Sequence, residues 1–260
     1  MTQSIYDFPA LFRAVHMEQP DEIDQEAAFL RRLWKRHYPR RVRRVLDVAS
    51  GDSPHGIILI RSGIKVVGVD RSASMLASGR LHSAGSGAIK FYRRPIERFT
   101  LPEKPFDCAF FMSETFPVMT TNRSILGHLK SVGRLLKRGG LYCIDIDRHD
   151  GLEAGRGRRL WRQRRVHALG ADIEVREYRV AAPWYAGAYF YELCCKIKNA
   201  NRTVVSTRDL VPVRYTLPSH LELAARASGS FGMVACYADL SLRNPLERCD
   251  RRWIAVLRRI

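Results

Sequence analysis

Short apolar runs alternate with helical patterns between residues 42 and 147, and this alternation limits the fold more than any other feature of the chain. Five runs have the composition of buried strands, at residues 42–48, 64–70, 88–92, 106–112 and 141–147. The stretches between them place apolar residues at helical spacing, at 55–62, from Ser72 onward and at 122–137. Strands that alternate with helices favour a parallel sheet with crossover helices. We therefore predict an α/β fold whose mostly parallel sheet is doubly wound.

The remaining residues add an arm and an insertion to this core. An amphipathic helix is expected after Asp21, within an N-terminal helical arm. Residues 171–215 alternate like the strands of an antiparallel ribbon with a turn at 199–201, which predicts a lid inserted on the sheet. A helix at 217–228 and strands at 230–240 and 251–260 complete a sheet of seven strands.

We expect a single domain with four parts. These are an arm over 1–40, a core over 41–148, a lid over 149–215 and the C-terminal part of the sheet over 216–260. Gly139 and Gly140 follow a helical pattern, and a glycine there suits the left-handed residue that ends many helices.

Composition excludes several classes of protein. No apolar run approaches the roughly 20 residues of a membrane span, and the N-terminus lacks the pattern of a signal peptide. We therefore expect a cytoplasmic protein without a membrane partner. The six cysteines lie mostly in apolar stretches without CxxC or Cys/His spacing, which predicts reduced, buried thiols and no metal site.

The charge of the chain is strongly positive and unevenly distributed. Lys and Arg number 44 against 26 Asp and Glu, a net charge of +18. Residues 31–44 hold eight Lys or Arg and no acid, and residues 148–165 hold seven Arg against two acids. A positive field favours anionic partners. The two segments fit either solvated arginine-rich surfaces or contacts with nucleic acid.

The segment VLDVASGDSPHG, at residues 45–56, has the pattern of a ligand-binding turn. An apolar strand runs into Asp47 and then into a loop with Gly51, and Gly56 follows. In an open parallel sheet the turn after the first strand commonly binds a ligand, and glycines allow close approach to the backbone. Asp47 can shape this loop or contact an amino group. The next strand ends at Asp70, an acceptor suited to the hydroxyls of a ribose. Together these features predict a nucleoside-containing cofactor.

Four motifs in this order resemble those of the class I S-adenosylmethionine-dependent methyltransferases, and within them the small-molecule N- and O-methyltransferases related to glycine and aminosugar N-methyltransferases. VLDVASGDSPHG is similar to their first motif, VVGVDRSASML to the second, PFDCAFFMSETF to the fourth strand and its loop, and LLKRGGLYCIDI to the fifth strand. The resemblance covers residues 1–148 and, more loosely, the rest. It implies a Rossmann-like fold, with S-adenosyl-L-methionine as cofactor and S-adenosyl-L-homocysteine as product.

The same resemblance implies which residues hold the cofactor. Asp70 takes the ribose hydroxyls, while Arg71 and Met75 flank the adenine. The full set is Tyr6, Asp47, Ala49, Ser50, Gly51, Gly56, Asp70, Arg71, Met75, Ile96, Glu97, Met112 and Ser113. Two departures matter: Pro95 stands where many relatives have an acid for the adenine amino group, and Ser113-Glu114-Thr115 stands where some aminosugar relatives have a histidine.

Two residues are candidates for proton transfer, although methyl transfer can proceed by positioning alone. Glu114 is the first, because a carboxylate at the acceptor face could orient or deprotonate an amine or hydroxyl. It could equally bind cofactor or cap the following turn. His149, just after the fifth strand, is a second candidate base or an exposed polar residue. His55 is expected to contact the loop or the cofactor.

Aromatic residues of the predicted lid are candidates for an acceptor pocket. Alternation places Tyr189 and Tyr191 on one face of the ribbon, and ordinary packing under the lid would explain that arrangement equally. The substrate-side candidates are Trp161, Trp184, Tyr185, Tyr189 and Tyr191.

Two functions fit the sequence. The first is an enzyme that methylates an N or O atom of a small-molecule acceptor, anionic or aromatic in character, with specialised metabolism as one setting. The second is an RNA or protein methyltransferase that docks through its arginine-rich segments. The chain lacks an NPPY motif and an appended RNA-binding module, which favours the first. The oligomeric state is left open.

Overall fold

The computed structural model describes residues 3–16, 21–103, 105–147, 157–182, 187–198, 204–243, 246 and 252–260. The chain divides into two compact units, each assembled from two stretches of sequence. We call Asp21–His149 with Thr216–Ile260 the seven-stranded unit, and Met1–Pro20 with Asp150–Tyr215 the four-stranded unit. The predicted arm is thus shared between them, since α1 (Pro9–His16) belongs to the four-stranded unit and α2 (Glu22–His37) to the seven-stranded one.

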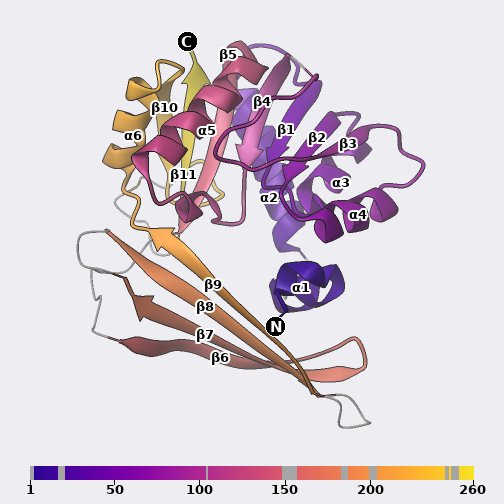
Figure 1. Ribbon diagram of the computed structural model, residues 1–260. Helices are drawn as coiled ribbons and strands as arrows, with labels where there is room; N and C mark the ends of the chain where they lie inside the picture. Colours follow the sequence, from indigo (N-terminus) through magenta and orange to yellow (C-terminus); the bar gives the residue numbers. More distant parts are fainter. Residues whose placement is uncertain are drawn as a thin grey trace. The chain divides into compact units, whose positions relative to one another are not determined.

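The seven-stranded unit contains the predicted mixed sheet (Figure 1). The strand order is β10-β11-β5-β4-β1-β2-β3, with only β11 antiparallel to its neighbours. The strands are β1 (Arg44–Val48), β2 (Lys65–Asp70), β3 (Ile89–Arg93), β4 (Phe106–Phe111), β5 (Leu136–Asp147), β10 (Phe231–Tyr237) and β11 (Arg252–Arg259). The fold class predicted from the alternating runs is confirmed.

Helices cover both faces of this sheet because successive strand residues point to opposite sides. Val45 packs with α2 and α3 (Pro54–Arg61) in one hydrophobic cluster, and the next residue, Leu46, packs with α5 (Asn122–Leu135) and α6 (Pro218–Ala227) in another. A further helix, α4 (Ala73–His82), connects β2 to β3, and a short 3₁₀ turn, η2 (Phe116–Val118), precedes α5. The four parallel pairings, with helices on both faces, make the sheet doubly wound.

The glycine pair before the fifth strand lies elsewhere than predicted. Helix α5 ends at Leu135 and β5 begins directly at Leu136, so Gly139 and Gly140 lie inside the strand. The pairing with β4 is irregular here, and Gly139 has a φ of +78°. A Cβ on Gly140 would lie 2.8 Å from the carbonyl oxygens of both Asp107 and Lys137. The pair therefore serves a bulge with close backbone contacts, rather than the end of a helix.

The four-stranded unit is an antiparallel sheet in the order β6-β7-β8-β9. Its strands are β6 (Arg158–Ala168), β7 (Ala171–Ala181), β8 (Ala188–Lys198) and β9 (Val204–Arg214). The 3₁₀ turn η1 (Ile5–Asp7) and α1 pack on one face, where Leu11 and Val15 join Ile173 and Val175 in a hydrophobic cluster. The predicted ribbon is confirmed, and its predicted turn at 199–201 lies outside the described residues.

The first strand of this unit was missed because its sequence, RRLWRQRRVHA, reads as a solvated basic surface. β6 pairs with β7 through a tight turn in which Leu169 and Gly170 have φ values of 56° and 68°. Two left-handed residues in a row are typical of the hairpin turn that joins adjacent strands. In the described part of the chain, no helix is long and apolar enough to cross a membrane.

Candidate functional site

The loop after β1 makes a tight turn at the carboxyl edge of the seven-stranded sheet. Ala49, Gly51 and Ser53 have left-handed φ values of 53°, 54° and 57°. The turn is closed by the Ser53 N–H, which donates to the Ser50 carbonyl over 2.7 Å, and the Ser50 N–H donates to Val69 of β2 over 3.0 Å. These bonds fix the loop against the neighbouring strand. The backbone is therefore already folded where the sequence predicts a cofactor.

Asp70, the last residue of β2, holds this loop from the side. Its Oδ2 accepts the Gly51 N–H over 2.8 Å, and its Oδ1 accepts the Ser72 N–H over 2.8 Å. Burial raises the pKa of Asp70, and the backbone donors oppose this effect. Each carboxylate oxygen has a second lone pair, so the side chain can still accept a ribose hydroxyl.

The two glycines of the motif have different surroundings. A Cβ on Gly51 would meet only the Met75 methyl group, at 3.1 Å, so one side of this residue is open to a ligand. A Cβ on Gly56 would overlap the Ser53 hydroxyl and approach Val66 to 3.0 Å. Gly56 therefore allows α3 to pack closely on β2, and its contact with the cofactor stays a prediction.

Asp47 is buried beneath the loop and supports it. The Ser53 hydroxyl donates to its Oδ2 over 2.6 Å. Burial raises the pKa of Asp47 to about 7, although the charge of His55 and the Ser53 hydrogen bond lower it. Of the two roles predicted for Asp47, the geometry matches the one that shapes the loop.

The residues predicted around the adenine lie at the start of α4 and in the segment of residues 96–97 that precedes β4. Arg71 is exposed, and its carbonyl accepts Arg93 Nε over 3.0 Å. The Ile96 carbonyl accepts from His128 Nδ1 over 2.7 Å. A Cβ on Gly127 would lie 2.7 Å from the carbonyl of Glu97, so the segment of residues 96–97 lies directly against α5.

The loop after β4 is strained where the acceptor face is predicted. Met112 is buried, whereas Ser113 and Glu114 have consecutive left-handed φ values of 62° and 54°. Such a conformation costs about 1 to 3 kcal/mol for each residue other than glycine and persists only where the surroundings enforce it. Thr115 Oγ1 donates to the Ser113 carbonyl over 2.9 Å. Phe111 pairs with Ile144, so this loop emerges beside the carboxyl end of β5.

A buried group of charged residues lies beneath these loops, and it was not predicted from the sequence. His55 Nε2 lies 2.5 Å from Glu26 Oε2, and Arg252 lies 2.5 Å from Glu26 Oε1 and 3.6 Å from Asp145 Oδ2. The signal in the sequence was Asp145 itself, since an acid inside the apolar run LYCIDI needs a cation or a proton.

Burial and charge act against each other in this group. Burial raises the pKa of Asp145 to about 6, while Arg252 and the Glu114 backbone N–H lower it. Burial also favours neutral Glu26, yet the hydrogen bond and charge of His55, together with Arg252, hold the Glu26 pKa below its usual value. The same bond raises the pKa of His55 despite its burial. His55 is therefore a buried partner of Glu26.

Three of the remaining predicted residues belong to the four-stranded unit. Tyr6 lies in η1 and contacts Phe12, with 5.3 Å between ring centroids. Tyr189 and Tyr191 share one face of β8, as the alternation predicts, and Tyr189 is buried. Trp184, Tyr185 and His149 lie outside the described residues.

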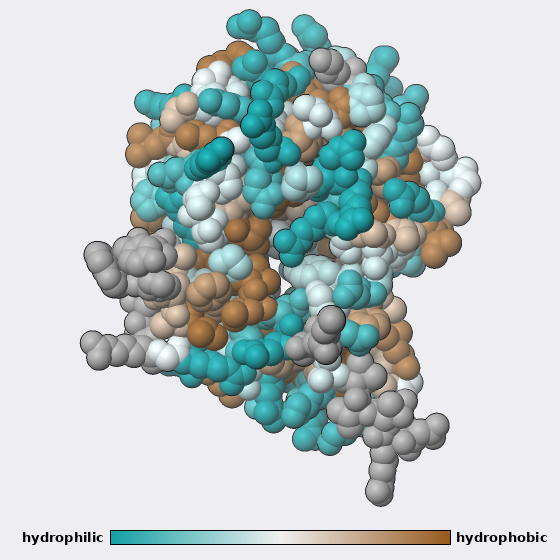
Figure 2. Space-filling view, in the orientation of Figure 1, coloured by the Kyte–Doolittle hydropathy of each residue, from teal (hydrophilic) through white to brown (hydrophobic). Residues whose placement is uncertain are grey.

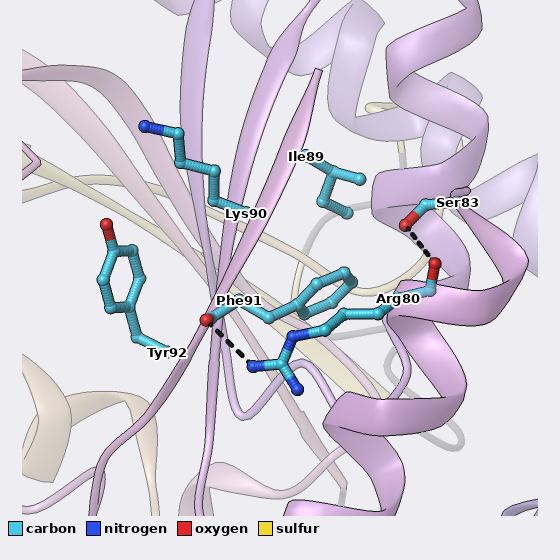
Figure 3. Close-up of a pocket in the computed structure, with 6 residues that line it drawn as sticks. All are labelled: Arg80, Ser83, Ile89, Lys90, Phe91 and Tyr92. Carbon is cyan, nitrogen blue, oxygen red and sulfur yellow. Dashed lines mark hydrogen bonds between the residues drawn. The ribbon is translucent and has the colours of Figure 1, made fainter. Parts of the chain in front are cut away.

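A hollow of about 410 Å³ lies away from all these residues, between β3 and α4 (Figure 3). Arg80 crosses it and donates to the Phe91 carbonyl over 3.3 Å. It is lined by Arg80, Ser83, Ile89, Lys90, Phe91 and Tyr92, none of which the motifs single out. Because β3 is the edge strand of the sheet, the hollow is separate from the loops after β1 and β4. In the described residues, no cluster of His, Cys, Asp or Glu could hold a metal ion.

An open doubly wound sheet, with a left-handed turn after its first strand and an acid at the end of its second, defines the class of α/β domains that bind nucleoside-containing cofactors. Residues 45–140 match the family model described as a methyltransferase domain. The resemblance drawn from the four motifs is confirmed by this match.

Known proteins show the same likeness. YqeM of Bacillus subtilis (strain 168), which has a provisional methyltransferase name, is 28% identical over 103 residues, covering 40% of this chain and 42% of YqeM. The chain thus matches less than half the length of that relative.

Solved structures are similar over nearly the whole chain. An S-adenosylmethionine-dependent methyltransferase of Clostridium acetobutylicum has a TM-score of 0.77 at 13% identity, covering 98% of this chain and 96% of that one. The sugar N-methyltransferase KedS8 of a Streptoalloteichus species has a TM-score of 0.75 at 16% identity, covering 96% and 93%. At these identities the likeness establishes the fold.

Proposed function

We propose that the protein transfers a methyl group from S-adenosylmethionine to an N or O atom of a small-molecule acceptor. The observation that carries the proposal is the preformed loop after β1, tied to Asp70 through the Gly51 N–H. This loop combines a backbone that a ligand can approach closely with a carboxylate that can accept hydrogen bonds from ribose hydroxyls. The matched methyltransferase domain includes both residues.

The residues present fit this cofactor. The open side of Gly51 admits the methionine moiety against backbone, and Asp70 retains lone pairs for the ribose. Met75 and the segment of residues 96–97 supply the surroundings of the adenine. The cofactor supplies an electrophilic methyl group on a sulfonium, so the protein's task is to align a nucleophile behind it and exclude water.

A small molecule is the acceptor class that the observations favour. The arginine-rich segment of residues 158–165 forms β6, and two of its arginines are neutralised within the sheet. Arg164 forms an ion pair with Glu177, and Arg158 with Glu192. A surface that docks RNA would instead leave such charges to phosphates. KedS8 methylates a sugar nitrogen by its name, and we propose an amino or hydroxyl group of comparable size here.

We propose that Glu114 orients the acceptor and removes its proton. The strained loop holds Glu114 just beyond the end of β4, next to the carboxyl ends of the central strands. An amine attacks through its lone pair, so an ammonium must first lose a proton, and a carboxylate in contact with it can receive that proton as a general base. Glu114→Gln, which preserves shape, should lower kcat by at least tenfold and leave cofactor affinity unchanged.

The deciding experiment measures cofactor binding and methyl transfer separately. Calorimetry with S-adenosylhomocysteine should show binding that Asp70→Ala weakens at least tenfold, whereas Asp172→Ala, an exposed acid of β7, serves as the matched control. Labelled S-adenosylmethionine is then supplied with a source-cell extract that is separated into small-molecule, RNA and protein fractions. Label in small molecules supports the proposal, label in RNA or protein contradicts the acceptor class, and unchanged binding by Asp70→Ala contradicts the cofactor site.

A further inference from the structure

We infer that the four-stranded unit carries a binding site for an oxyanion, centred on the Arg179 guanidinium, and that it recognises a phosphate or carboxylate group of the acceptor. The inference deepens the proposed function and rests on it for the identity of the ligand as acceptor. The site itself rests on contacts within the four-stranded unit.

Aromatic rings hold Arg179 in place. Its guanidinium carbon lies 4.7 Å from the centroid of Trp161 and 5.5 Å from that of Tyr189. Trp161 in turn meets Tyr191 edge to face, with 6.4 Å between centroids, and Tyr189 lies 5.4 Å from Tyr215. Stacking on ring faces orients a guanidinium while leaving the N–H groups in its plane available for an acceptor.

The Arg179 Nε–H is a buried donor without an acceptor among the described residues. A buried donor without a partner is unfavourable, and native proteins rarely retain one without a reason. Nε is one limb of the fork with which arginine binds carboxylate and phosphate oxygens in pairs. An oxyanion is therefore the ligand chemistry that would satisfy this group.

The strand register also places a second arginine next to Arg179. The strand register places Arg159 of β6 directly opposite Arg179, and like charges directly opposite each other destabilise a sheet. Glu177 lies two residues along β7 on the same face, but it forms its ion pair with Arg164. Neither neighbouring strand places a carboxylate directly opposite Arg179, since Arg159 of β6 and Tyr191 of β8 stand there.

The opposite face of the same sheet provides an internal comparison. There Arg176 pairs with Glu174 over 2.6 Å, and Arg158 and Arg208 share Glu192, each over 2.5 Å. The unit can therefore supply carboxylates to its arginines, and at Arg179 the described residues supply aromatic rings instead. This difference points to a ligand on the face of Arg179.

The test titrates the full-length protein with inorganic pyrophosphate and, separately, with malonate, while tryptophan fluorescence and calorimetry report binding. Trp161 beside Arg179 provides the optical signal, which Trp161→Phe should remove. We expect saturable binding of at least one anion, weakened tenfold or more by Arg179→Met and only partly restored by Arg179→Lys, because lysine keeps the charge but loses the fork. Arg176→Met on the opposite face is the matched control and should bind like the unaltered protein.

The outcomes separate this inference from the proposed function. Preference for pyrophosphate assigns the site to a phosphate group, and preference for malonate assigns it to a carboxylate. Equal affinity in Arg179→Met and in the unaltered protein, with both shown to be folded by circular dichroism, overturns the inference. Binding that depends on Arg179 without methyl transfer to any small molecule supports the site and refutes the proposed function. Methyl transfer to an uncharged acceptor, at a rate that Arg179→Met does not alter, supports the proposed function and refutes the inferred site.

Discussion

Two small residues in the loop after β1 have nearly the same φ, and substitutions at them should act in opposite directions. Ala49 adopts 53° with a Cβ, which costs about 1 kcal/mol in this region, so Ala49→Gly should leave stability unchanged or raise it by up to about 1 kcal/mol. Gly51→Val places a branched side chain at 54° and against the Met75 methyl group. It should cost about 2 kcal/mol or more and abolish cofactor binding.

Urea unfolding and calorimetry with S-adenosylhomocysteine check both variants. Because both residues lie in one turn, each variant shows whether the effect of the other variant is only a general disruption of the loop. A Gly51→Val protein that binds the cofactor normally would contradict the loop's assignment, and a large loss of stability in Ala49→Gly would show that its side chain contributes packing beyond what φ indicates.

Asp47 should give the protein a distinctive dependence on pH. The folded-state pKa of about 7 lies above the ordinary value of 3.8, so folding takes up a proton, and the stability from neutral Asp47 is lost as the pH rises from about 4 through about 7. Asp47→Asn cannot ionise. Its stability relative to the unaltered protein should therefore rise by up to about 1.4 kcal/mol per pH unit in that window and become constant above it. Urea unfolding at several pH values measures the difference, and a flat difference would refute the pKa.

The loop after β1 and its neighbour Asp70 could be singled out from the sequence, whereas the buried charges could not. Gly51 and Asp70 stood out because a turn and a strand end leave a signal in consecutive residues, and their contact with the cofactor stays a prediction. The partners of Asp145 were not found, because Glu26 and Arg252 lie more than 100 positions away along the chain and meet it only in the folded core. The packing role of Gly56 could not be separated from a cofactor contact in the sequence, because close packing of a helix on a strand demands the same residue type as close approach of a cofactor.

At the level of secondary-structure elements, the buried charged residues join α2, β5 and β11. Arg252→Met should destabilise the protein by about 3 to 5 kcal/mol, because Asp145 would stay buried without its cation and Glu26 would keep only His55. Adding Glu26→Gln removes one uncompensated charge, so the double variant should be more stable than the sum of the two single losses. Urea unfolding of the four proteins completes the cycle, and strictly additive losses would show that the residues do not interact.

Helices and strands were predicted well where buried side chains recur at a regular spacing along the chain. They were predicted poorly where such a spacing is lacking. The strands of the seven-stranded sheet are continuous apolar runs because both faces are covered. β6 has mostly exposed side chains and is an edge strand, so its sequence has no burial pattern to read. Gly139 and Gly140 were predicted at the end of a helix. In the sequence, a left-handed glycine in a bulge cannot be distinguished from one that ends a helix.

At the scale of the whole molecule, each of the three hydrophobic clusters formed by the described residues lies within a single unit. Two belong to the seven-stranded unit and the third to the four-stranded unit. The sequence predicted an insertion over residues 149–215, but it gave no sign that residues 1–20 join it. The apolar face of α1 is complementary to β7, some 160 residues later, and a helical pattern does not specify which surface will bury it. The excess positive charge is also a property of the whole chain, and hydrophilic residues cover much of the visible surface (Figure 2).

This division predicts that the seven-stranded unit folds and binds cofactor by itself. A protein made of residues 21–149 joined through a short linker to residues 216–260 keeps all seven strands and both of that unit's clusters. It should unfold cooperatively in urea and bind S-adenosylhomocysteine through Asp70 and the loop after β1, with affinity lost again in Asp70→Ala. It should transfer no methyl group, because the proposed acceptor site at Arg179 lies in the other unit. A non-cooperative transition would show that the units depend on each other for folding, and retained transfer would place acceptor recognition in the seven-stranded unit.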